Sequence, residues 1–187
     1  MFIRIKKIKK YKYAYRVKNK WTKKGARQKT VGYLGRVYEL QASDSNNEEN
    51  SFNIFIKIGL EQYLLASKPK DIVRDYIGYE LHKHGFISDI KESSDYKDVW
   101  INKENITVNL NELTIKKGNA NVVLHLNNDF LCEYSLKKLL NFRSKSDQEE
   151  CGREFAQAFV SAGIPIEPKI FVEVFSKIFR EGDVSYL

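Results

Sequence analysis

The sequence predicts an α+β fold, in which an antiparallel β-meander curled toward a small half-barrel precedes a domain with a three-stranded antiparallel sheet and C-terminal helices. Two observations indicate this order of elements. Apolar residues alternate with polar ones in residues 1–40 and again in residues 99–126, a period of two that is typical of strands. In residues 69–84 and in segments after residue 135, apolar residues recur at helical spacing instead.

Residues 1–40 predict three strands. In the middle strand, apolar residues fall on one parity and cations on the other, so we expect one face to pack as core and the other to be solvated. Residues 22–25 supply a turn, in which Gly25 can adopt a positive φ without steric cost. The flanking strands are expected at Phe2–Ile8 and Arg27–Leu34. The apolar parity consists of Tyr11, Tyr13, Tyr15, Val17 and Trp21.

The positive charge of the chain is concentrated in these strands. Residues 1–40 hold 10 Lys and 4 Arg against a single acid, Glu39, so their net charge is +13, whereas the 187-residue chain carries +8. The rest of the chain is therefore slightly acidic, at −5. A concentrated basic segment on an otherwise acidic protein indicates a polyanionic partner.

Nucleic acid is the expected partner, ahead of an acidic protein or a membrane. Cations on one strand face recur at roughly 6–7 Å, so a row of them can neutralise several phosphates. A face that is merely solvated normally mixes both signs of charge. Trp21 or Tyr33 could also stack on bases of a single strand, although both fit the core of the sheet. The expected contact residues are Lys10, Lys12, Arg16, Lys18, Lys20, Trp21, Lys23, Lys24, Arg27, Gln28, Lys29 and Arg36.

Short motifs follow one another in a characteristic order in this segment. They are MFIR at residues 1–4, the tyrosine-rich strand, KGARQK at residues 24–29, and YLGR at residues 33–36 closed by Glu39-Leu40. This order resembles the N-terminal β-module of DDE-type insertion-sequence transposases. The resemblance covers residues 1–40 and implies a nucleic-acid-facing module, with Arg27, Gln28, Lys29 and Arg36 at the matching positions. The rest of the chain is too short for a typical DDE catalytic core and offers no triad of spaced carboxylates, so we do not expect it to catalyse transposition alone.

The chain divides into a basic β-module at residues 1–40, a linker at residues 41–53 and an α+β domain at residues 54–187. The linker is polar and lacks periodic apolar residues. Phe52–Leu65 is densely apolar and is expected to be a strand that runs into a helix. The three strands of the domain sheet are expected at Val99–Ile101, Ile106–Ile115 and Asn121–Leu126.

Helices are expected where stripes of apolar residues meet capping signals. Pro69–His84 begins with a proline that suits a first turn and ends before Gly85. Ser135 can cap a helix at residues 136–141, and Ser146 with Glu149 has the spacing of a capping box for a helix at residues 147–162. A last helix is expected at residues 167–179.

The sequence contains no motif for a cofactor, and we expect no catalytic residue, metal ligand or cofactor. His82 and His84 are two apart, so on a helix they cannot chelate one metal ion. Cys132 and Cys151 lack a Cys-x-x-Cys context and are expected to be buried thiols. If the chain were a metal-dependent nuclease, its candidate residues would be Asp98, Glu104, Glu112 and Lys116.

These observations favour a non-enzymatic nucleic-acid-binding protein of the cytoplasm that contacts the phosphate backbone of DNA or RNA, ribosomal RNA included. Two alternatives are open: a metal-dependent nuclease or other DNA-processing enzyme, and an adaptor whose C-terminal domain binds a protein partner. The adaptor would use Phe52–Leu65 as an exposed patch. No apolar stretch approaches the length of a membrane span, so a membrane is not expected as a partner.

Overall fold

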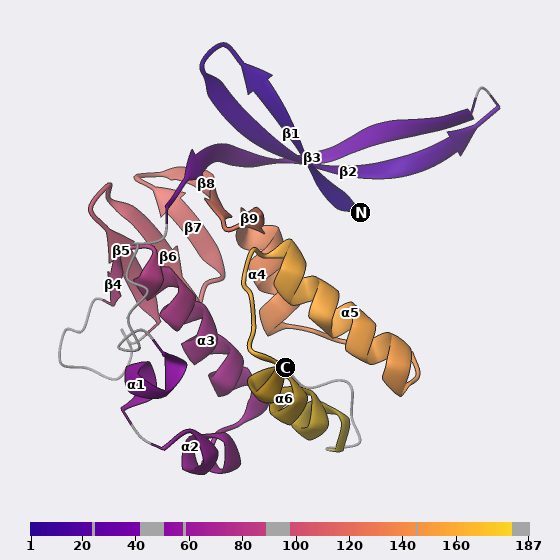
Figure 1. Cartoon of the computed structure of the whole chain (residues 1–187). Coiled ribbons are helices and arrows are strands. Elements are labelled where there is room, and N and C mark those ends of the chain that lie inside the picture. The colour runs from indigo at the N-terminus through magenta and orange to yellow at the C-terminus, as the bar shows by residue number, and fades with distance from the viewer. Residues whose placement is uncertain (24, 42–50, 58, 89–97, 145, 181–187) are drawn as a thin grey trace.

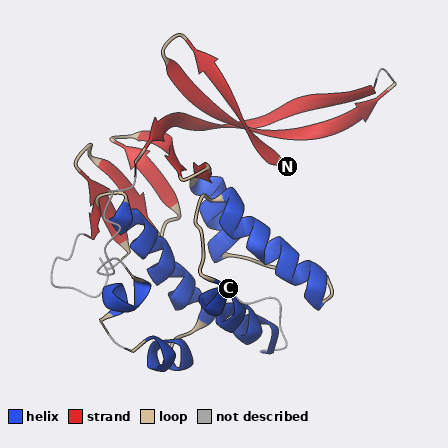
Figure 2. Cartoon of the chain, in the orientation of Figure 1, coloured by secondary structure: helices blue, strands red, loops and turns tan. Residues whose placement is uncertain are grey.

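The computed structural model describes residues 1–23, 25–41, 51–57, 59–88, 98–144 and 146–180. Within these residues, nine strands and six helices form a mixed α+β structure (Figures 1 and 2). The strands are β1 (Phe2–Ile8), β2 (Tyr11–Thr22), β3 (Gly25–Glu39), β4 (Phe86–Ser88), β5 (Val99–Asn102), β6 (Ile106–Asn109), β7 (Thr114–Lys117), β8 (Ala120–Leu126) and β9 (Asp129–Leu131). The helices are α1 (Phe52–Ile56), α2 (Leu60–Ala66), α3 (Pro69–Lys83), α4 (Glu133–Leu140), α5 (Gln148–Ser161) and α6 (Pro168–Arg180).

One open sheet runs through the molecule in the order β1-β2-β3-β8-β7-β6-β5-β4, and β9 also pairs with β8. All neighbouring strands are antiparallel except β3 and β8. The predicted α+β class and the N-terminal meander are confirmed. The predicted separate three-stranded sheet is wrong, and because the sheet stays open, the meander does not curl into a half-barrel.

The predicted strand Ile106–Ile115 is in fact a hairpin. The side chain of Asn109 accepts hydrogen bonds from the main-chain N–H groups of Asn111 (2.9 Å) and Glu112 (3.0 Å), which turns the chain. Leu113 then adopts a positive φ of 57°, and β7 returns alongside β6. The asparagine therefore divides one alternating apolar pattern into two short strands.

The segment Phe52–Leu65 is not a strand running into a helix, because its first half is the short helix α1. Phe52 is buried, with its ring centroid 4.9 Å from that of Tyr76 and 5.6 Å from that of Tyr79 on α3. This aromatic packing outweighs the strand preference of the β-branched residues in the segment. Of the predicted linker at residues 41–53, residues 42–50 lie outside the described part of the chain.

The predicted helices in the second part of the chain are present, with altered starts. Ser135 is the third residue of α4 rather than its cap, and its hydroxyl accepts a hydrogen bond from the N–H of Cys132 at 2.8 Å. The cap of α5 is Asp147 rather than Ser146, since its carboxylate accepts from the N–H of Glu150 at 2.9 Å. Helix α3 crosses the sheet closely at Gly78, where an added Cβ would lie 3.0 Å from Cε2 of Trp100.

The basic module joins the rest of the sheet through the second half of β3. Residues Arg36–Glu39 pair in parallel with Val122–His125 of β8. Here Gly35 has a φ of 138°, and a Cβ on it would lie 2.8 Å from the Cα of Val122. A small core seals the junction: Ala14, Val37, Val123 and Cys132 are buried together, with Ile3, Ile5, Leu34, Phe130 and Tyr134 packed around them.

We predict that Gly35→Ala weakens this junction, because the added methyl group meets the backbone of β8 and the backbone angle is unfavourable for any residue with a Cβ. The free energy of unfolding in urea should fall by roughly 1–3 kcal/mol. Gly59→Ala is the control, since Gly59 has a φ of −58° and open space around it. Equal stability of the two variants would contradict the close approach of β3 to β8.

Candidate nucleic-acid interface

The outer halves of β2 and β3 form a two-stranded ribbon, called here the arm, which consists of residues 17–22 and 25–30. It extends away from the helices and from β1 (Figure 1). Two irregularities in the β2–β3 register, between Ala14 and Tyr15 and between Arg16 and Val17, precede the arm. Such bulges increase strand twist and redirect a ribbon. Apart from Val17, the arm residues are exposed on both faces.

Like charges lie opposite one another across the arm. Lys18 pairs with Lys29, and Lys20 pairs with Arg27. Because directly opposed residues share a face, these four cations form one cluster, called here the arm cations. Opposed like charges destabilise a strand pair. None of the ion pairs found among the described residues includes an arm cation. The arm thus holds a concentrated positive charge that no acidic side chain neutralises within the described residues.

The tyrosines of β2 have the opposite parity to the arm cations Lys18 and Lys20, and they do not form the core of the module. Tyr11, Tyr13 and Tyr15 are half-buried, whereas Tyr33 is 58% and Trp21 81% exposed. The expectation that Trp21 and Tyr33 fit the sheet core is therefore wrong. The physical reason is the small core at the junction, which is built on the other parity of β2 around Ala14. On its own parity Ala14 lies between Lys12 and Arg16, so that face of β2 carries little hydrophobic signal, whereas the face with the tyrosines carries a strong one.

Tyrosines and cations alternate on this face. The ring of Tyr33 lies 5.4 Å from that of Tyr15 and 6.3 Å from that of Tyr13. The guanidinium of Arg36 lies 3.7 Å from the ring centroid of Tyr11, and the ammonium of Lys6 lies 5.1 Å from that of Tyr15. These distances are those of cation–π contacts. Partial burial, followed by the neighbouring Tyr13 and Tyr15, raises the pKa of Tyr33 above its ordinary value, so its hydroxyl stays protonated at neutral pH.

Sequence reasoning missed the contribution of β1 to this face. Arg4 pairs with Tyr15 and Lys6 with Tyr13 across the β1–β2 ladder, and the guanidinium of Arg4 donates a hydrogen bond to the side-chain oxygen of Gln28 at 2.7 Å. The alternation of apolar and polar residues in residues 2–8 predicts a strand. Only the register of the β1–β2 ladder shows which of its cations lie next to the tyrosines.

The structure distributes the predicted contact residues over three places. The arm and its tip bring together seven of them: Lys18, Lys20, Trp21, Lys23, Arg27, Gln28 and Lys29. Lys10 lies over Tyr11, Lys12 forms an ion pair with Glu39, and Arg36 lies on the tyrosine face. Arg16 packs at the junction, with its guanidinium 5.5 Å from the ring centroid of Tyr134. Lys24 lies outside the described residues.

The acidic residues that a nuclease would require do not share one site, because Asp98 and Glu104 each interact with a different cation. Asp98 accepts a hydrogen bond from Arg74 at 2.9 Å, and Glu104 lies 3.2 Å from Lys117. Glu112 is in the turn between β6 and β7 and not on a strand. Across the described ranges, no three His, Cys, Asp or Glu side chains gather in a way that could hold a metal ion. As predicted, Cys132 and Cys151 are buried free thiols.

The segment considered for an adaptor is part core and part surface. Phe52, Tyr63 and Leu64 are buried, whereas Ile54 is 52% and Leu65 80% exposed. Among the described helices, none is both long and apolar enough to cross a membrane.

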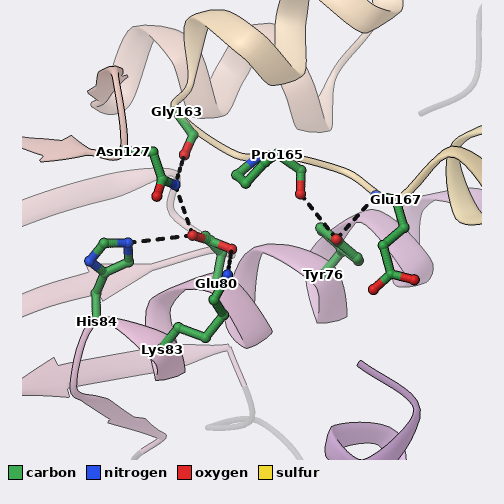
Figure 3. A network of polar contacts seen from close by, with 8 residues as sticks. All are labelled: Tyr76, Glu80, Lys83, His84, Asn127, Gly163, Pro165 and Glu167. Atoms are coloured by element: carbon green, nitrogen blue, oxygen red, sulfur yellow. Dashed lines mark hydrogen bonds and ion pairs between the residues drawn. The ribbon is translucent and has the colours of Figure 1, made fainter. Parts of the chain in front are cut away.

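A buried polar network ties α3 to two connections of the second part of the chain (Figure 3). The side-chain amide of Asn127 donates to a carboxylate oxygen of Glu80 (2.8 Å) and to the carbonyl of Gly163 (2.7 Å). Lys83 and His84 lie 3.1 Å and 3.4 Å from the same carboxylate. The Glu80 side chain is only 1% exposed, so a substrate could not reach it, and we assign the network a role in holding the fold.

Burial raises the pKa of Glu80, but the nearby imidazole of His84, the hydrogen bond from Asn127 and the charge of Lys83 outweigh burial and leave the pKa below its ordinary value. A carboxyl group whose pKa falls on folding stabilises the fold above its unfolded pKa of about 4.3, and that stabilisation is lost as the pH falls through the folded pKa.

When the chain is compared with protein-family models, with curated proteins and with solved structures, no match is found in any of the three.

We predict that Glu80→Gln lowers the free energy of unfolding by roughly 1–3 kcal/mol at pH 7, because it removes the charge that the buried network accommodates. The difference in the free energy of unfolding between the variant and the native protein should become smaller as the pH falls from 5 to about 3, since protonation of Glu80 removes the same charge from the native protein. Urea unfolding across this pH range measures both effects. Glu112→Gln, at an exposed turn, is the control and should leave the free energy of unfolding unchanged. If the destabilisation by Glu80→Gln did not vary with pH, this would contradict an ionised Glu80 in the network.

Proposed function

We propose that the protein is a non-enzymatic nucleic-acid-binding protein that binds the phosphate backbone through its N-terminal β-module. The observation that carries this proposal is the opposition of like charges in the arm, Lys18 to Lys29 and Lys20 to Arg27. In the free protein this arrangement costs stability, whereas a phosphate placed between two opposed cations turns repulsion into attraction. A membrane surface or an acidic protein is also anionic, but the resemblance to the transposase module favours nucleic acid.

Contact with phosphates also releases the counterions condensed on the nucleic acid, which gives a favourable entropy that depends on salt. Lys23 at the tip adds to the arm cations, and Arg36, Lys6 and Arg4 lie on the other face of the module. Such contacts position a protein on its partner without reading sequence. The α+β domain carries the module and supplies the sheet on which it is anchored.

Neutralising the arm cations tests the proposal. The quadruple variant Lys18→Gln, Lys20→Gln, Arg27→Gln and Lys29→Gln should bind nucleic acid much more weakly than the native protein. The slope of log K against log salt concentration should fall by about 3, because about four fewer counterions are released. Fluorescence anisotropy of labelled oligonucleotides over a salt series measures both quantities.

The matched control removes four exposed lysines outside the module, in Lys68→Gln, Lys103→Gln, Lys116→Gln and Lys169→Gln. It has the same net charge as the arm variant but should keep its affinity within a few-fold and its salt slope nearly unchanged. Equal loss of binding in the two variants would mean that net charge alone attracts the nucleic acid and that the arm is not the binding site.

A single charge reversal should separate binding from stability. Lys29→Glu places a carboxylate opposite Lys18, so it replaces repulsion with attraction inside the arm. We expect exchange of the arm amide protons with solvent to slow by about two- to fivefold, while affinity for nucleic acid falls by about tenfold or more at low salt. Slower exchange with unchanged affinity would show that the opposed cations are not a binding site.

A further inference from the structure

We infer that the partner is single-stranded nucleic acid, and that its unpaired bases stack on the tyrosine face of the module and on Trp21. The tyrosine face consists of Tyr11, Tyr13, Tyr15 and Tyr33. The inference rests on the proposed function, because it assumes that the arm cations bind phosphates, and it adds the class of nucleic acid and a second set of contacts.

The tyrosine face is an aromatic surface that the described part of the chain covers only in part, because Tyr33 is exposed and the other three tyrosines are half-buried. Helix α4 and strand β8 pack at the opposite face of β2, where Ala14 is buried with Cys132 and Val123. Tyr33 lies at the centre of the aromatic surface, tilted by 54° against Tyr15 and by 42° against Tyr13. Because Tyr33 is the most exposed of the three, a base could lie on its ring without any movement of the backbone.

Trp21 extends this surface toward the tip of the arm. It has the same parity on β2 as the tyrosines and pairs with Ala26, whose small side chain leaves the indole open. Ten residues separate Tyr11 from Trp21, a path of roughly 33 Å along the bent strand β2, which is enough for several nucleotides. An indole that is 81% exposed contributes nothing to a core, so packing does not account for it.

Cations are interleaved with these aromatic rings. Arg36 lies over Tyr11 and 4.9 Å from the ring centroid of Tyr38, and Lys6 lies over Tyr15. Aromatic platforms alternating with cations are the arrangement by which proteins hold a single strand, since each nucleotide offers a flat base and a phosphate. A second copy of this chain is a poor occupant of the same surface, because residues 1–40 carry a net charge of +13 and would repel one another.

A duplex would not use this surface. In paired nucleic acid, the faces of the bases are stacked on one another and only their edges are open in the grooves. Phosphate contacts alone would require the arm cations but no exposed aromatic rings. The coincidence of the arm cations with the exposed rings of Tyr33 and Trp21 therefore favours unpaired bases.

The two tryptophans of the chain provide a direct readout. Trp21 is exposed, whereas Trp100 is only 7% exposed beneath α3, so quenching of the fluorescence by an added oligonucleotide reports mainly on Trp21. The probes are homopolymers of deoxythymidine and of uridine, each about 15 nucleotides long, and a DNA duplex of equal length. Both single strands should quench the native protein, and Trp21→Phe should abolish the change. The duplex should bind more weakly and quench little.

Substitutions at Tyr33 test the stacking without changing charge. Tyr33→Ala should weaken binding of the single strands by about 5- to 100-fold, whereas Tyr33→Phe, which keeps the ring, should stay within about twofold of the native protein. Because Tyr33 is exposed, both variants should fold, and thermal unfolding checks this. Neither substitution should alter the slope of log K against log salt concentration.

The outcomes separate the inference from the proposed function. If single strands bind with a steep salt dependence, but Tyr33→Ala leaves their affinity unchanged and they do not quench the fluorescence of Trp21, the arm binds phosphates and the stacking inference is overturned. Equal or tighter binding of the duplex overturns it as well, while leaving the proposed function intact. Absence of binding to all three probes overturns both.

Discussion

The parallel pairing of β3 with β8 is the constraint on which the other features depend. Strand β3 has two partners: its first half completes the arm with β2, and its second half, Arg36–Glu39, joins the domain sheet. Gly35 stands between the halves, where only a residue without a side chain permits the close approach to Val122. Since the junction is sealed on one face of β2 by the small core around Ala14, the tyrosines must occupy the other face. The position of that core thus decides which side chains meet solvent.

In the module, the stability of the strand pair conflicts with the proposed binding of phosphates. A strand pair selected for stability alone would place acids opposite Lys18 and Lys20, yet Lys29 and Arg27 are there. The repulsion is tolerable because the arm is exposed and water screens its charges, and because the buried interactions that hold the fold lie elsewhere. One such interaction is the Glu80 network, which fastens α3 to the connections around Asn127 and Gly163 (Figure 3). The proposed binding surface and the stabilising core are therefore separate parts of the molecule.

Local patterns were enough to predict the α+β class, the three N-terminal strands and the position of α3, because each depends on periodicity and capping within a few turns or residues. They failed where a long-range contact or a single side chain decided the outcome. The side chain of Asn109 turned one predicted strand into β6 and β7, and aromatic packing of Phe52 on α3 made a helix of an apolar segment. The candidate arm could be predicted from charge, but its register could not. The exposure of Tyr33 depends on a core formed with β8 and α4, far away in sequence, so alternation alone gave the wrong face.

Acylation of lysines in the native protein, read by mass spectrometry with and without a saturating single-stranded oligonucleotide, tests the central claim most directly. It follows each lysine separately and requires no substitution. Bound phosphates should protect Lys18, Lys20 and Lys29, while the exposed Lys68, Lys103 and Lys169 outside the module react as before. Unchanged reactivity of the three arm lysines at saturation, or protection confined to lysines beyond residue 40, would contradict binding by the arm.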